Sequence, residues 1–314
     1  MREVDVRAAE AFDYLLDQLL VLFPSANPWH APDSYSPNYR LLERLLSVPV
    51  RQGAGQQSGR LARATDAWVA HELRGAGFGE HEVWPRARSP RVLPQPLVAV
   101  EDAVRRLFVD GKVPVPIRDA IRGWSQAYLL GQYYRKQVDV VISNWDRGAE
   151  LIVSTKSMLS SYWNNLRNRF EEFIGDARNL RGRYPLAAIG ILFVVRSTVF
   201  EETGAFDFLV DMLRRLRSAD LYDTVGLVVV AWHEEVSATW RGRLQLDRLV
   251  SESPVVTLVI DHVPVDLGAE RFLADLVDCV LSRTPVTFHV RCRELRLGRS
   301  VPVPEEGGGE TPTP

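Results

Sequence analysis

The segment Glu150-Leu-Ile-Val-Ser-Thr-Lys156 is a run of mainly apolar residues that ends in a lysine. The segment before it, Gln137-Val-Asp-Val-Val-Ile142, is a second apolar run and contains an aspartate. Short runs rich in valine and isoleucine predict buried β-strands, and residues 144–148 between them predict a turn. The two segments, 137–143 and 150–156, therefore predict adjacent strands that carry Asp139 and Lys156.

Lys156 is an unusual choice for this chain, because only three of its 38 basic residues are lysine, at positions 112, 136 and 156. Arginine is a planar fork that stays charged, whereas the lysine ammonium is a compact point charge. A site that needs one mobile donor beside a reacting oxygen favours lysine for this reason. An ammonium kept within an apolar strand indicates a functional cation.

The alternation of apolar runs and amphipathic segments after residue 156 predicts an α/β fold. We expect helices at residues 161–181, 206–217 and 270–281, and strands at 187–195, 224–232 and 255–260. Before residue 137 we expect helices at 4–23, through 41–46, at 60–74 and at 117–134, and a short strand at 83–84. The expected architecture is a central mixed sheet with helices on both faces.

Stretches rich in glycine and proline divide the chain into three parts. Residues 1–58 are expected to form an N-terminal helical appendage and a linker, which contains most of Gly53-Ala-Gly-Gln-Gln-Ser-Gly59. Residues 59–300 then form the α/β domain. Residues 301–314 contain a glycine run and repeated proline, a composition that predicts a disordered tail.

Composition limits the classes of function. The chain has 314 residues, 46% of them hydrophobic, and a net charge of −2, so a nucleic-acid partner would need a local basic face. Cys279 and Cys292 lack the spacing of a metal site, and the apolar run at 13–23 is too short to span a bilayer. We expect a soluble, cytoplasmic protein.

The residues on the two central strands suit phosphodiester hydrolysis, which needs an activated water, a metal that polarises the phosphate and a cation near the developing charge. Asp139 can bind the metal, and Lys156 can hold the water or the phosphate. Mg²⁺ suits such a site, because it takes oxygen ligands and leaves room for water and substrate. Ser154 shares a strand face with Lys156 and can hydrogen-bond a ligand.

Val138-Asp139 and Ser154-Thr155-Lys156 resemble the motif of the PD-(D/E)xK nucleases, the restriction-endonuclease-like superfamily. The resemblance covers roughly residues 130 to 196. In a Ser-x-Lys variation of that superfamily, the following helix supplies the missing acid, and Glu171 and Glu172 fill that position here. Glu171 has the nearer offset, and both stay candidates for catalysis and metal binding.

Other candidates follow from strand phase and from local charge. Glu150 is in phase with Ser154 and Lys156 and is an alternative metal ligand, or a solvated residue at the start of the strand. A set of arginines can bind DNA phosphates, or can pair with neighbouring acids: Arg86, Arg88, Arg167, Arg169, Arg178 and Arg181.

The resemblance implies a restriction-endonuclease-like core and Mg²⁺-dependent endonucleolytic cleavage of double-stranded DNA, in restriction or anti-phage defence. It is compatible with a homodimer and with partner proteins of a defence system. The alternative is a catalytically inactive protein of the nuclease fold that binds DNA or a partner, since Ser154 replaces the acid of the motif.

Overall fold

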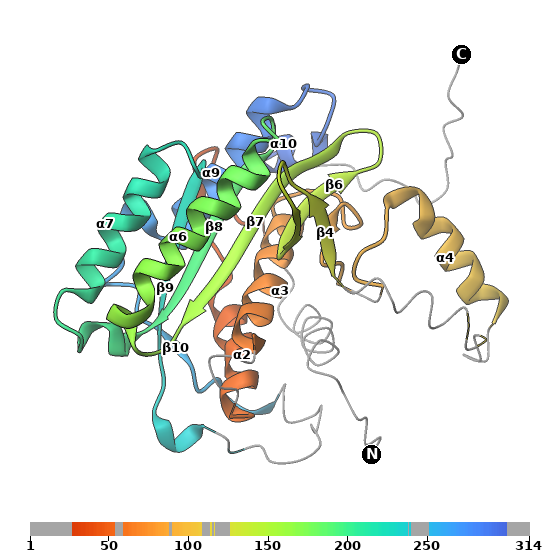
Figure 1. Cartoon of the computed structure of the whole chain (residues 1–314). Helices are drawn as coiled ribbons and strands as arrows, with labels where there is room; N and C mark the ends of the chain where they lie inside the picture. The colour runs from red at the N-terminus through yellow and green to blue at the C-terminus, as the bar shows by residue number, and fades with distance from the viewer. Residues whose placement is uncertain are drawn as a thin grey trace.

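A computed structural model describes residues 27–53, 59–87, 90–108, 114, 116, 126–237, 239 and 251–299. Its centre is a curled, mixed sheet of six strands in the order β10-β9-β8-β7-β6-β3 (Figure 1). Strands β7, β8 and β9 run parallel, and β3, β6 and β10 pair antiparallel with their neighbours. The expected α/β class with a mixed sheet is therefore confirmed.

The strands of this sheet are β3 (Val83–Trp84), β6 (Val140–Asn144), β7 (Gly148–Met158), β8 (Ala188–Arg196), β9 (Thr224–Ala231) and β10 (Thr257–Leu258). Two separate hairpins are formed by β1 (Trp29–Ala31) with β2 (Ser34–Tyr35) and by β4 (Ala127–Leu130) with β5 (Arg135–Val138). The central strand β7 is buried along most of its length, as the apolar run at its centre predicts.

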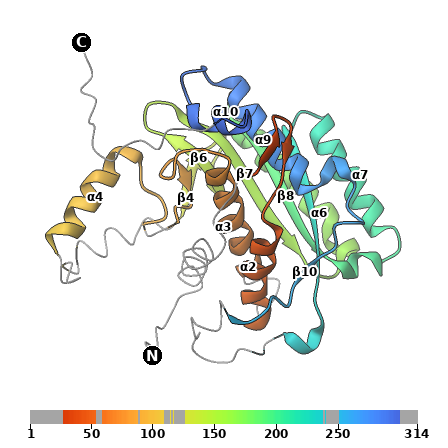
Figure 2. The ribbon, with the colours of Figure 1, turned by 180° about the vertical axis from the view of Figure 1, so that it is seen from behind.

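Helices cover both faces of the sheet. One face carries α2 (Tyr39–Arg51), α3 (Arg60–Gly75) and α9 (Ala269–Arg283), which lie in front in Figure 2. The other carries α6 (Tyr162–Arg181) and α7 (Ala205–Ser218), in front in Figure 1. Two further α-helices of the described residues are α4 (Gln95–Leu107) and α10 (Val290–Arg296). Among the described helices, none combines the length and the apolar character that crossing a membrane requires.

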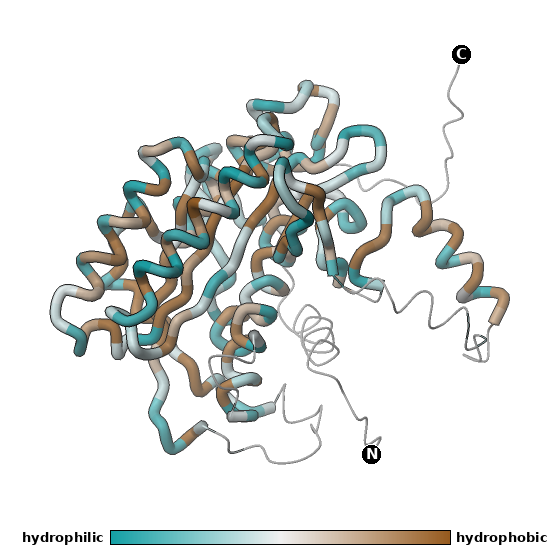
Figure 3. Tube along the Cα trace, viewed as in Figure 1, coloured by the Kyte–Doolittle hydropathy of each residue, from teal (hydrophilic) through white to brown (hydrophobic). Residues whose placement is uncertain are grey.

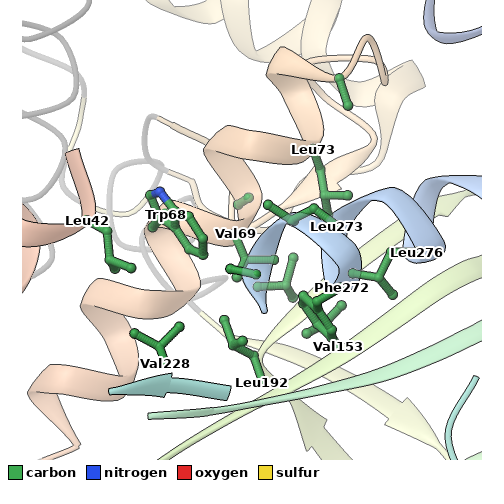
Figure 4. Packing of buried hydrophobic residues seen from close by; sticks show 14 of the residues in the cluster. Leu42, Trp68, Val69, Leu73, Val153, Leu192, Val228, Phe272, Leu273 and Leu276 are labelled. Atoms are coloured by element: carbon green, nitrogen blue, oxygen red, sulfur yellow. The ribbon is translucent and has the colours of Figure 1, made fainter. Parts of the chain in front are cut away.

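Apolar side chains fill the space between each helix layer and the sheet, and the central strands are largely hydrophobic (Figure 3). Figure 4 shows Trp68 and Val69 of α3 and Phe272 of α9 above Val153 and Leu192 of the sheet. Trp68 is completely buried and contributes one of the largest apolar areas of this layer.

The expected boundary near residue 58 is not visible in the packing. Leu42, Leu45 and Leu46 of α2 are fully buried and belong to the same core as Val153 of the sheet. Helix α2 therefore forms part of the domain and is no separate appendage. The helix expected at residues 4–23 and the tail at 301–314 lie outside the described residues.

Two expectations around residues 117–143 are wrong. Residues 127–130 form strand β4, and 131–134 form the turn of the β4–β5 hairpin, where a helix through 134 was expected. The strand expected at 137–143 is divided at Asp139 into β5 and β6. The reason is tertiary, because β5 leaves the main sheet to pair with β4.

Candidate active site

Asp139 lies at the point where β5 and β6 separate. Pairing between β6 and β7 ends at Val140 and Val153, so the following residues of β7 have no β6 partner in the ladder. Beyond this point the side chain of Asp139 supplies an acceptor for β7, because its Oδ2 accepts a hydrogen bond of 3.0 Å from the backbone N–H of Thr155. This bond fixes the carboxylate beside the end of β7.

Lys156 is the next residue of β7, and its ammonium lies between two carboxylates. Its Nζ is 4.0 Å from Asp139 Oδ2 and 3.9 Å from Glu172 Oε1. Glu172 also accepts a 2.7 Å hydrogen bond from Arg169. The lysine is partly exposed, so substrate can reach it. The structure thus brings Asp139, Lys156 and Glu172 together, as the sequence indicated.

The two helix glutamates differ in position. Glu172 faces Lys156 from α6, whereas Glu171 is exposed, although the offset along the sequence favoured Glu171. Ser154 is buried and lies on the α6 face of β7, the face it shares with Ile152 and Lys156.

Asp66 on α3 completes the cluster, and the sequence did not indicate it. The hydroxyl of Thr155 donates a hydrogen bond to Asp66 Oδ1, while its backbone N–H donates to Asp139. Part of Asp66 reaches solvent, but burial of its carboxyl group, reinforced by the negative charge of Asp139, raises its pKa well above the usual range. Burial also raises the pKa of Asp139, and Lys156 and the Thr155 amide oppose that shift.

A signal for Asp66 was present in the helix expected at 60–74. Leu61, Ala64 and Trp68 define its buried face, and Asp66 lies at the border of that face. Glu72 on the same helix is buried elsewhere, where its carboxylate accepts hydrogen bonds from Tyr35 and from the amide of Asn38. Of these two acids on α3, Asp66 contacts the site and Glu72 does not.

The donor set can be compared with what a divalent cation requires. Among the described residues, no three His, Cys, Asp or Glu side chains converge as a metal-holding group. Asp66 and Asp139 supply two carboxylates on either side of Thr155, and each favours protonation because burial and like charge disfavour its ionised form. Mg²⁺ is commonly held by one or two carboxylates, with waters and substrate phosphate completing its shell. Asp66 and Asp139 match this requirement in the number and the chemistry of their oxygen ligands.

A second set of charges lies one helical turn along α6. Lys136 Nζ of β5 is 2.6 Å from Asp176 Oδ2, and the hydroxyl of Tyr134 donates a 3.3 Å hydrogen bond to Asp176 Oδ1. Asp176 is buried, so its carboxylate needs these partners. The pairs attach the β4–β5 hairpin to α6 beside Glu172.

Glu150 does not belong to the site, and the reason is a β-bulge. Ile142 pairs with Leu151 and Ser143 with Ala149, so Glu150 is an extra residue without a partner across the strand pair. The alternation of side chains between the two faces of β7, counted back from Lys156, therefore does not continue through Glu150. The carboxylate of Glu150 accepts a 3.0 Å hydrogen bond from Arg147 and lies 3.3 Å from His289 Nε2. These contacts give it a structural role.

The arginines expected to bind DNA are in different situations. Arg181 pairs with Asp223 at 2.8 Å, and Arg169 pairs with Glu172. Arg86 is buried and lies 3.8 Å from Glu101, so its side chain is not on the surface. Arg167 and Arg178 are exposed on α6. Arg88 lies outside the described residues.

A cavity of about 620 Å³ lies elsewhere, between β9, β10 and the beginning of α9. Tyr39, Asp261 and Glu270 are among its lining residues, and none of the residues around Lys156 contributes to it. The candidate active site is the cluster around Lys156, which combines a cation on a central strand with the carboxylates of Asp139 and Glu172. Comparison of the chain with protein families, with curated proteins and with solved structures gives no match.

Proposed function

We propose that this protein is a metal-dependent endonuclease that hydrolyses DNA phosphodiester bonds, on a core similar to that of the restriction endonucleases. The observation that carries the proposal is the position of Lys156, whose ammonium lies about 4 Å from both Asp139 and Glu172 at the open end of β7. Asp66 and Asp139 flank the same residue, Thr155, and offer oxygen ligands to a divalent cation.

Each residue has a role that follows from its surroundings. Mg²⁺ bound here would supply a Lewis acid that polarises the phosphate and lowers the pKa of water. Asp66 and Asp139 would hold it, and Thr155 orients both carboxylates. Lys156 would hold the attacking water or the scissile phosphate, and Glu172 positions the ammonium for that task. A role in defence against foreign DNA rests on the sequence resemblance alone.

The second candidate is a protein of this fold that binds nucleic acid or a partner without cutting it. One observation favours it: Lys156 already has two carboxylate neighbours, and such groups are often purely structural. Asp139→Ala and Lys156→Ala distinguish the two candidate functions. In a nuclease these substitutions abolish DNA cleavage, whereas a protein that only binds has no cleavage activity to lose.

The test is nicking of supercoiled plasmid in Mg²⁺ and in Mn²⁺ by the wild type and both variants. A nuclease loses about 100-fold or more in rate with either substitution, while its circular dichroism spectrum is unchanged. Asp146→Asn, in the exposed turn between β6 and β7, is the matched control and keeps full activity. Equal nicking by wild type and variants would indicate a contaminant and reject the proposal.

A further inference from the structure

The β4–β5 hairpin presents an unusual surface directly beside the candidate site. Four of its large side chains are exposed: Tyr128, Leu130, Tyr133 and Tyr134. Tyr128 and Leu130 share the outer face of the hairpin, because Ala127 and Val138 on the other face are buried. Soluble proteins rarely gather exposed aromatic rings without a partner for them.

The hairpin is held rigidly, although its outer face is exposed. Asn179 of α6 is fully buried, and its side chain accepts hydrogen bonds from the amides of Tyr133 (2.8 Å) and Tyr134 (3.2 Å) and donates to the carbonyl of Tyr134 (3.1 Å). The amide of Gln132 donates to the Asn179 carbonyl at 2.8 Å. The backbone of the turn is therefore fixed to α6, which lowers the cost of ordering this segment when a partner binds.

The charge of the hairpin favours an anionic partner. Residues 126–138 contain no aspartate or glutamate. Of their two cations, Lys136 is paired with Asp176, and Arg135 lies on the outer face with Tyr128. The guanidinium of Arg135 lies 4.0 Å from the centre of the Tyr128 ring, so a cation and an aromatic face form one surface. Such a combination is typical of surfaces on which nucleobases stack while cations neutralise the phosphates.

The hairpin also leads directly into the site. Asp139 follows Val138, the last residue of β5, and Tyr128 lies opposite Gln137. At roughly 3.3 Å per strand residue, Tyr128 lies about 7 Å along the strand from Asp139, a spacing of about two nucleotides in a stacked strand. A strand whose phosphate reaches Lys156 would thus bring neighbouring bases over the hairpin.

We propose that the outer face of the hairpin, with Tyr128 and Arg135, and the exposed Tyr133 of the turn stack unpaired nucleobases, and that the preferred substrate is single-stranded or locally unpaired nucleic acid. This inference rests on the proposed function, because it extends the same site. Stacking requires a free base face, which an intact duplex covers. A protein partner is the competing occupant, and the experiment separates the two.

The experiment measures the affinity of the full chain for a fluorescein-labelled 20-nucleotide single strand and for the duplex of the same sequence, in Ca²⁺ and without turnover. Tyr128→Ala and Tyr133→Ala each weaken binding of the single strand about 5-fold or more, up to about 150-fold. Tyr128→Phe and Tyr133→Phe keep the ring and restore most of the affinity. Trp145→Ala, an exposed aromatic residue in the β6–β7 turn, is the matched control and leaves the affinity unchanged.

Several results overturn the inference. The first is tighter binding of the duplex than of the single strand, and the second is unchanged affinity in both alanine variants. The third is no binding of nucleic acid at low salt, a result that would favour a protein as the partner of this surface. Cleavage reports on the proposed function separately. If the single strand binds through the rings but no cleavage occurs, the proposed nuclease activity is rejected and the proposed binding surface on the hairpin is retained. If both alanine variants nick plasmid at the full rate, only the proposed role of the hairpin is rejected.

Discussion

Asp66 and Asp139 both accept hydrogen bonds from Thr155, one from its hydroxyl and one from its backbone amide. One carboxylate comes from helix α3 and the other from the junction of β5 and β6. Burial raises the pKa of each, and the charge of Asp139 adds to the effect on Asp66. A cation between them would relieve the cost of keeping both ionised.

Asp66→Asn is expected to stabilise the metal-free protein and to abolish stabilisation by metal. The folded chain binds a proton at Asp66 more tightly than the unfolded chain does, so ionisation at neutral pH works against folding. The substitution removes that cost, and the gain disappears as the pH falls to the ordinary range of aspartate, about 4. Thermal unfolding in EDTA at pH 5 and pH 8 measures it.

The same variant tests the metal site. A divalent ion at 100 times its Kd stabilises the wild type by about 2.7 kcal/mol. The variant should lose most of this gain, whereas Asp146→Asn in the β6–β7 turn should keep it. Equal stabilisation of all three proteins by Mn²⁺ would place the ion elsewhere.

Glu172→Gln is expected to slow cleavage between about 10-fold and 100-fold, because a misplaced catalytic group costs rate in this range. The loss of charge releases Lys156, whose Nζ lies 3.9 Å from Glu172 Oε1. Glu171→Gln changes the same charge on the adjacent, exposed residue and should leave the rate within about 2-fold of wild type. Initial rates of plasmid nicking compare the two variants. A slower rate for Glu171→Gln than for Glu172→Gln would assign the positioning of Lys156 to Glu171.

Much of the fold was predictable, because the core strands and helices follow strong hydrophobic patterns. The helix expected at 161–181 is α6, Tyr162–Arg181, and the strand expected at 187–195 is β8, Ala188–Arg196. The proximity of Asp139 and Lys156 also followed from the sequence, because the two residues lie within adjacent apolar strands.

The parts that failed depend on contacts between distant segments. Asp66 reaches the site because α3 packs across β7. The periodicity of residues 60–74 places Asp66 at the border of the buried face of the helix, but it does not show which strand that face contacts. Glu150 fell out of phase because a single extra residue in β7 interrupts the alternation. Residues 127–130 became a strand because β5 was available as a partner, which local propensity does not encode.

Glu72→Gln is expected to remove a pH-dependent part of the stability. Burial raises the pKa of Glu72 from 4.5 to about 7, although Tyr35 and the Asn38 amide donate hydrogen bonds to its carboxylate. The folded state therefore favours the protonated form, and stability falls as the pH rises from about 4.5 to about 7, by about 3 kcal/mol. The glutamine cannot ionise, so its free energy of unfolding changes less over that range. Urea unfolding at pH 5, 6, 7 and 8 compares the two proteins, and parallel pH profiles would contradict the assignment.

Arg181→Gln is expected to lower the stability of the protein and Arg178→Gln to leave it almost unchanged, although both arginines lie in the last turn of α6. Arg181 donates to the buried carboxylate of Asp223 at 2.8 Å and to the carbonyl of Ala187 at 3.1 Å, so its loss should cost about 1–3 kcal/mol of stability. Arg178 is exposed, and its loss should leave the stability within about 0.5 kcal/mol of wild type.

If Arg178 contacts a phosphate, its replacement should reduce the salt dependence of nucleic-acid binding by about 0.7 to 0.9 in the log–log slope. Urea unfolding measures the effect on stability. Fluorescence anisotropy between 50 and 200 mM salt, over which the Debye length falls by about half, measures the effect on the slope with the same preparations. A stable Arg181→Gln variant would mean that the ion pair to Asp223 contributes little, and an unchanged slope in Arg178→Gln would remove this arginine from the nucleic-acid surface.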